Sequence, residues 1–193
     1  MPINKWLRML QFITVASFLN SFTILLPFIP ASASTWISWT IMGVMCFCMC
    51  KLALANDRYR KAGIYRGAML VCSLITTFLY ASRFLPLAAS VFSIIAVYHE
   101  FQGHAELAET EDSKLAQNWR SLFMWEILAG FVLSVVSTVV AVLLIVLSKD
   151  ISAITGMIVG RVPQLVVDCF YLYYLQRMII LFRRENEVPP YDE

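Results

Sequence analysis

Long apolar stretches follow one another along this chain, and most are about 20 residues long, the length that a helix needs to cross the hydrocarbon core of a bilayer. The 193 residues are 60% hydrophobic and only 15% charged. A soluble domain of this size needs more polar residues to cover its core. The sequence therefore predicts an all-α, polytopic integral membrane protein.

Prolines and charged residues divide the apolar sequence into six segments. Pro27 and Pro30 end the first segment, and Asn56–Lys61 follows the second. Arg83 interrupts a later stretch that is too long for a single crossing. We therefore expect one transmembrane domain over residues 1–184, with six spans at about residues 9–28, 35–54, 63–82, 85–101, 121–147 and 152–182.

Two polar segments lie outside the predicted spans. Residues 102–120 are rich in alanine and acidic side chains, so we expect a helical, amphipathic connector on the cytoplasmic side. Residues 185–193 should form a polar cytoplasmic tail.

The distribution of lysine and arginine predicts the orientation. With six spans and a cytoplasmic N-terminus, the outer segments hold only Arg83 and Lys149, and nearly all other basic residues lie in inner segments. Cytoplasmic loops carry such an excess of basic residues. We therefore expect both termini in the cytoplasm, and a multi-pass protein of the bacterial cytoplasmic membrane.

Ionisable residues within the spans are the first candidates for a binding site, because an unpaired charge is costly in hydrocarbon. Arg161 and Asp168 lie in the sixth span, on nearly the same helix face, and Pro163 between them frees a backbone carbonyl. They could bind a cation or a zwitterionic solute inside the bundle. The alternative is a structural pair that fixes helix packing.

Three further polar residues could complete this ligand-binding site. Asn20 is deep in the first span, and Tyr80 and Arg83 lie near the outer side of the third and fourth. The alternative for Asn20 is a hydrogen bond to a neighbouring helix.

A third candidate is a proton or partner cluster near the cytoplasmic side. Glu100 and His104 are four residues apart and should face each other on a helix, with His99 beside them. The two histidines are five apart, so their side chains diverge and do not match the His-Glu-x-x-His zinc motif. We therefore expect no metal, no catalytic residue and no cofactor here, and the leading interpretation is a solvated connector.

Glu126 belongs to the same cytoplasmic boundary. Trp119 and Trp125 stand near it and are expected as interfacial anchors. Glu126 could pair with Arg120 or with the basic link at residues 58–66, and the acidic connector could dock on that link.

Small residues spaced by four predict close helix contacts, within the chain or in a homo-oligomer. The two pairs are Gly63 with Gly67 and Gly156 with Gly160. The five cysteines lie in apolar segments, where we expect reduced thiols that pack as small hydrophobes.

These features favour three classes of function, in a fixed order. The first is a subunit that binds or transports a small solute through a polar site inside the bundle. The alternative is a non-catalytic scaffold or regulator that binds a protein partner through the acidic connector, and a membrane-embedded enzyme ranks last. The lipid bilayer is the expected environment, and the few basic residues give no reason to expect nucleic-acid binding.

Overall fold

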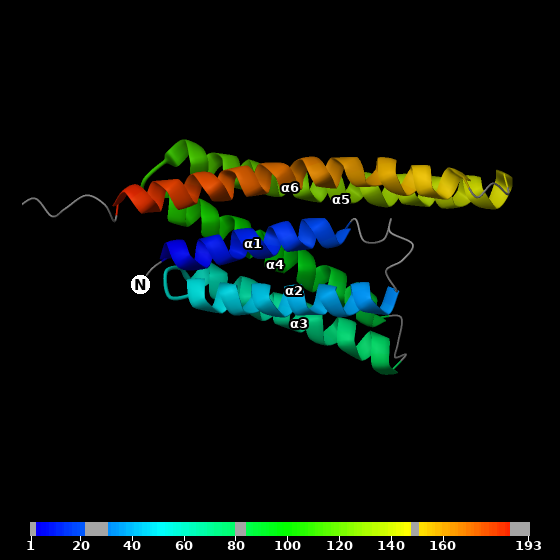
Figure 1. Cartoon of the computed structure of the whole chain (residues 1–193), viewed down its shortest axis with the longest axis horizontal. Coiled ribbons are helices and arrows are strands. Elements are labelled where there is room, and N and C mark those ends of the chain that lie inside the picture. Colours follow the sequence, from blue (N-terminus) through cyan, green and yellow to red (C-terminus); the bar gives the residue numbers. More distant parts are fainter. Residues whose placement is uncertain (1–2, 22–30, 80–83, 148–150, 186–193) are drawn as a thin grey trace, which may run out of the picture.

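The computed structural model describes residues 3–21, 31–79, 84–147 and 151–185, and within these ranges every regular element is an α-helix (Figure 1). The six helices are α1 (Ile3–Ser21), α2 (Ala31–Leu52), α3 (Asp57–Leu79), α4 (Phe84–Glu109), α5 (Ser113–Leu147) and α6 (Ile151–Glu185). Their number and order agree with the all-helical prediction.

Two helix starts are fixed by polar caps that the sequence supplies. The Asn56 side-chain oxygen accepts a hydrogen bond from the Arg58 backbone N–H at 2.7 Å, at the start of α3. Asp112 accepts one from the Leu115 N–H at 2.9 Å, at the start of α5. Side-chain oxygens at this position satisfy N–H groups that the helix leaves unpaired.

The predicted connector at residues 102–120 is not a separate element. Helix α4 continues through it to Glu109, and α5 begins at Ser113. The inner face of this part of α4 is buried, including Glu100, His104 and Ala108. The prediction of a solvated connector was therefore wrong for this stretch, because neighbouring helices cover it.

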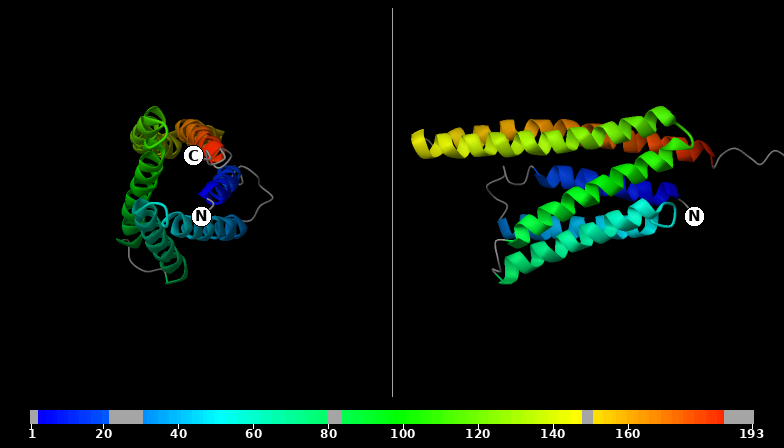
Figure 2. Two further views of the ribbon diagram at one scale, coloured as in Figure 1. Left: turned by 90° about the vertical axis from the view of Figure 1, so that its left-hand side faces the viewer. Right: turned by 180° about the vertical axis from the view of Figure 1, so that it is seen from behind.

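The helices form a ring in chain order. Each helix packs on the next one along the chain, and α1 closes the ring by packing on α6. The end-on view in Figure 2 shows this arrangement. The two longest helices, α5 and α6, lie side by side and extend past the others at one end (Figure 1).

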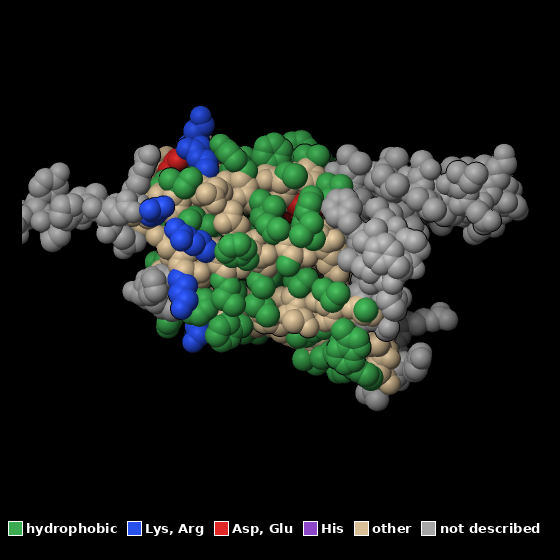
Figure 3. Space-filling model, viewed as in Figure 1, with side chains coloured by type: hydrophobic (Ala, Val, Ile, Leu, Met, Phe, Trp, Pro, Cys, Tyr) green, Lys and Arg blue, Asp and Glu red, His purple; other side chains and the backbone are tan. Residues whose placement is uncertain are grey.

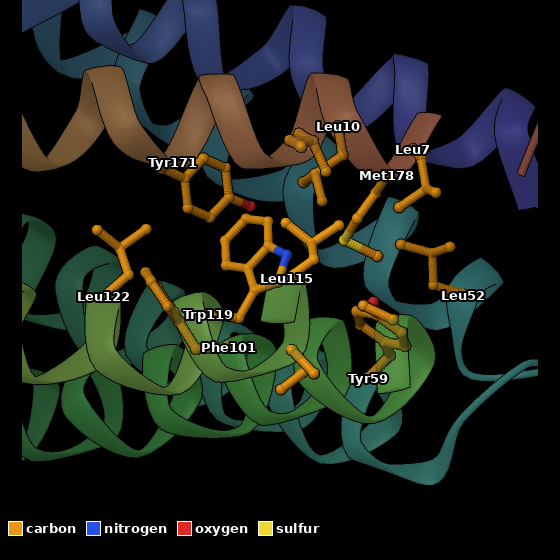
Figure 4. Packing of buried hydrophobic residues seen from close by; sticks show 14 of the residues in the cluster. Leu7, Leu10, Leu52, Tyr59, Phe101, Leu115, Trp119, Leu122, Tyr171 and Met178 are labelled. Atoms are coloured by element: carbon orange, nitrogen blue, oxygen red, sulfur yellow. The ribbon is translucent and has the colours of Figure 1, made fainter. Parts of the chain in front are cut away.

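The hydrophobic core is at the end where α3 and α5 begin and α4 and α6 end. Close packing there requires Gly103, because a Cβ on it would lie 3.2 Å from two ring carbons of Tyr59. Figure 4 shows the core side chains converging from all parts of the ring: Leu7, Leu10, Leu52, Tyr59, Phe101, Leu115, Trp119, Leu122, Tyr171 and Met178.

Of the glycines predicted to mediate close contacts, Gly63 does so within the chain. A Cβ on Gly63 would lie 3.3 Å from the Met49 Cβ of α2, whereas nothing lies within 4 Å of such an atom on Gly67. The surroundings of Gly156 and Gly160 lie outside what the structure describes.

Four helices are long and apolar enough to cross a membrane: α2 (Thr35–Leu52), α4 (Phe84–Glu109), α5 (Ser113–Val136) and α6 (Pro163–Arg183). Large hydrophobic side chains cover the outside of the bundle, and Lys and Arg gather at the end that holds the core (Figure 3).

Candidate functional site

A buried group of polar side chains lies within the core and joins α3, α4 and α6. We call Tyr59, Arg66, Glu100, His104 and Tyr171 the buried cluster. Glu100 is at its centre and is only 1% exposed. Its carboxylate accepts a hydrogen bond from the Arg66 guanidinium, and a second from the Tyr171 hydroxyl at 2.5 Å. Glu100 is thus paired and hydrogen-bonded, as a buried charge must be.

His104 links the two tyrosines of the buried cluster. Its Nδ1 lies 2.8 Å from the Tyr59 hydroxyl oxygen, and its Nε2 lies 3.3 Å from that of Tyr171. Because Tyr171 donates its proton to Glu100, its oxygen can accept from Nε2–H of a neutral imidazole. The ring then accepts at Nδ1 from Tyr59. Glu100 and His104 lie 3.9 Å apart, so the prediction that they face each other is confirmed.

The Tyr59 hydroxyl is held in its protonated form. Burial, and then the negative charges of Glu100 and Glu106, raise the pKa of Tyr59 well above its usual value. A tyrosine that keeps its proton is a lasting donor to His104. This hydrogen bond therefore fixes the start of α3 against the end of α4.

Replacing Tyr59 with phenylalanine is expected to lower the free energy of unfolding by about 1–3 kcal/mol, because Nδ1 of His104 stays buried without a donor. The pH dependence should change as well. Above pH 10 the unfolded chain releases the Tyr59 proton and the folded chain keeps it, so stability falls as pH rises. This loss, about 1.4 kcal/mol per pH unit, should disappear in Tyr59→Phe.

Unfolding of the purified protein in mixed micelles, followed between pH 7 and 11, would test this expectation. Tyr173→Phe is the matched control, since Tyr173 is 55% exposed. An identical alkaline slope for Tyr59→Phe and the parent protein would contradict the assignment.

Ion pairs between neighbouring segments surround the buried cluster. Glu106 accepts from the Arg58 Nε at 2.8 Å and from the Asn56 amide at 3.0 Å, and Glu109 pairs with Arg120 at 2.6 Å. The acidic end of α4 thus docks on the basic link, as the sequence suggested. His99 stacks on Tyr65 and does not share these contacts.

A second polar group joins α5 to α6, and we call Glu126, Gln164 and Asp168 the acidic group. The Gln164 amide nitrogen lies 3.0 Å from each carboxylate oxygen of Glu126 and 3.4 Å from the Asp168 Oδ1. All three side chains are partly exposed. The predicted pairing of Glu126 with Arg120 was wrong, because Arg120 binds Glu109 instead.

The two polar groups share one face of α6. Gln164, Asp168 and Tyr171 are spaced by four and three residues, which brings them onto the same side of a helix. Asp168 and Tyr171 are about 4.5 Å apart along the axis. A polar stripe therefore runs from the core end of the bundle into the apolar part of α6.

The acidic group lies where the surface is otherwise apolar. In Figure 3, acidic atoms are visible at the bottom of a hollow flanked by hydrophobic side chains, on the face that shows α1 and α6. Glu126 is the single acidic residue of α5.

The structure places the other predicted ligand-binding residues as follows. Asn20 donates a hydrogen bond to the Ser38 hydroxyl at 2.8 Å and so joins α1 to α2, which is the packing role weighed from the sequence. The Arg161 side chain, Tyr80 and Arg83 lie outside what the structure describes. The expected meeting of Arg161 with Asp168 is therefore still a prediction.

Three residues of these polar groups escaped the sequence analysis. Arg66 was counted only as an inner basic residue, although it pairs with Glu100. Gln164 stands four residues before Asp168, a spacing that could have revealed it, and Tyr171 stands three after.

Within the described ranges, no three His, Cys, Asp or Glu side chains are grouped so that they could hold a metal ion. A comparison of the chain with protein-family models, curated proteins and solved structures finds no match.

Proposed function

We propose that this chain is a multi-pass membrane protein whose six helices cross the bilayer, with both termini in the cytoplasm and a small solute bound at the acidic group. Four helices have the length and composition for a crossing. The outside of the bundle carries exposed side chains such as Phe12, Phe84 and Phe131, which water would not favour. The bacterial cytoplasmic membrane is the location that we expect from the sequence.

The charge distribution supports the proposed orientation. Lys and Arg gather at the core end of the bundle in Figure 3, where the chain enters α1 and leaves α6. Because cytoplasmic ends carry the basic excess, this end is assigned to the cytoplasm. Reporter fusions at both termini test the assignment: a cytoplasm-dependent reporter should be active at each end, and activity at one end alone would contradict the six-span arrangement.

The observation that carries the solute proposal is the meeting of Glu126 and Asp168 around the Gln164 amide, partly exposed among apolar side chains. Carboxylates in such surroundings are costly, and they commonly mark a solute or ion pathway. The Gln164 N–H groups are directed at the carboxylates, so the free amide oxygen and the carboxylate lone pairs are acceptors. The site therefore suits a solute with an ammonium group.

The scaffold alternative has less support, since its acidic side chains have internal roles. Glu106 and Glu109 form ion pairs within the chain, and Asp112 caps α5. A homo-oligomer through the glycine faces is also less favoured, because Gly63 already packs on α2.

Binding of small amines and amino acids to the purified full chain tests the solute proposal. A panel of primary amines, quaternary amines and zwitterions would be screened by thermal stabilisation, and retained small molecules identified by mass spectrometry. Asp168→Asn and Glu126→Gln should each weaken binding about 10- to 100-fold, the effect of losing a charged hydrogen-bond partner. Glu106→Gln, at a carboxylate away from the site, should leave binding unchanged.

If no compound of the panel binds and no molecule is retained, the solute proposal fails. It fails equally if Glu106→Gln weakens binding as much as Asp168→Asn does.

A further inference from the structure

A groove of about 530 Å³ runs between α5 and α6. Its walls are almost entirely apolar, with Val166 and Phe170 on α6 and Trp125 on α5. None of the three residues of the acidic group is among the described residues that line it. The groove is therefore a separate feature from the proposed solute site.

The polar residues of the groove lie at one end. Asn118 and Ser121 line it near the start of α5, and Tyr174 lines it toward the end of α6. From Asn118 the α5 wall continues to Val132, which is about 21 Å of helix. One leaflet of hydrocarbon is about 15 Å thick. The groove thus has the length of one acyl chain, with its polar end at the core end of the bundle.

Two basic side chains extend the groove walls beyond this polar end. Lys114 lies one turn before Asn118, and Arg177 lies three residues after Tyr174, each on the groove side of its helix. Both are exposed, and neither forms an ion pair with the residues that the structure describes.

The register of the two helices brings these cations to the same level. Gln164 lies opposite Glu126, and farther along, the Trp119 ring lies 5.2 Å from that of Tyr171 and 5.8 Å from that of Tyr174. Continuing the antiparallel pairing by five residues sets Arg177 beside Lys114. Two cations therefore flank the polar end of an apolar, chain-length groove.

We propose that the groove binds one acyl chain of an anionic phospholipid from the cytoplasmic leaflet, with the lipid phosphate between Lys114 and Arg177. Basic pockets between helices on the cytoplasmic side bind such headgroups. Asn118 and Ser121 then lie at the level of the glycerol backbone, where their amide and hydroxyl groups can bind ester oxygens. The inference rests on the proposed membrane location and orientation, but not on the solute site.

Native mass spectrometry of the full chain, purified in mild detergent with equal amounts of phosphatidylglycerol and phosphatidylcholine of the same acyl composition, tests the headgroup. Two cations should enrich the retained anionic lipid roughly thirtyfold. Lys114→Gln with Arg177→Gln should bring the ratio close to one. The matched double variant Lys5→Gln with Arg8→Gln removes two exposed charges from α1 and should keep the enrichment.

A second pair of variants tests the groove itself. Val166→Trp fills it from α6 and should abolish retention of both lipids, whereas Val135→Trp, at an exposed position that does not line it, should not.

Equal retention of the two lipids by the parent protein would overturn the proposal. So would loss of enrichment in the α1 variant, or a dimer that Val166→Trp dissociates, since a second copy would then fill the groove. These outcomes are distinct from failure of the terminal reporters or of amine binding.

Discussion

Replacing Glu100 with alanine should lower the free energy of unfolding by about 3–5 kcal/mol, the usual effect of breaking a buried ion pair. The Arg66 guanidinium would keep its charge at a position that is only 13% exposed, without the carboxylate that pairs with it. The Tyr171 hydroxyl would also lose its acceptor. Unfolding by heat or by sodium dodecyl sulfate in mixed micelles measures the loss.

A double replacement separates an unpaired charge from a lost contact. Glu100→Leu with Arg66→Met removes both charges and fills similar volume with apolar atoms, and it should recover most of the stability. Glu106→Gln is the matched control on the same helix. Glu106 pairs with Arg58 while 34% exposed, and such a pair contributes about 1 kcal/mol or less. An equal effect for Glu100→Ala and Glu106→Gln would contradict the central role of the buried cluster.

The sequence predicted the helices well and their inner contacts poorly, for a physical reason. Apolar length and the position of Pro27, Arg83 and Lys149 are local properties, so six helices and their order could be predicted from them. Burial of Glu100 and His104 depends instead on α3, α5 and α6 covering the end of α4. Nothing in the local pattern of an alanine-rich acidic stretch reports that cover.

The polar residues of α6 show the same division. Asp168 was a candidate because a charge in an apolar span is visible in one sequence window. Its connection to Glu126 depends on the register of α5 against α6, which only the packed helices define. The spacing of Gln164, Asp168 and Tyr171 predicted a shared face but not which helix that face meets.

Trp119→Ala is expected to lower the free energy of unfolding by about 3–5 kcal/mol, as deletion of a large buried aromatic does. The sequence suggested an interfacial anchor, but the Trp119 side chain is fully buried. Its ring lies 4.5 Å from that of His104 and 5.6 Å from that of Phe101 on α4, and 5.2 Å from that of Tyr171 on α6 (Figure 4). Trp119 therefore joins three helices in the core.

The neighbouring Trp125 supplies the control for this prediction. It is 59% exposed, so Trp125→Ala should change stability by about 0.5 kcal/mol or less. The indole N–H of Trp119 has no hydrogen-bond partner in the described structure, so the loss comes from packing, and Trp119→Phe should retain a large part of the stability. If instead Trp119→Ala and Trp125→Ala unfold at the same midpoint, both tryptophans face lipid and the packing of α4, α5 and α6 around His104 is different from the one described.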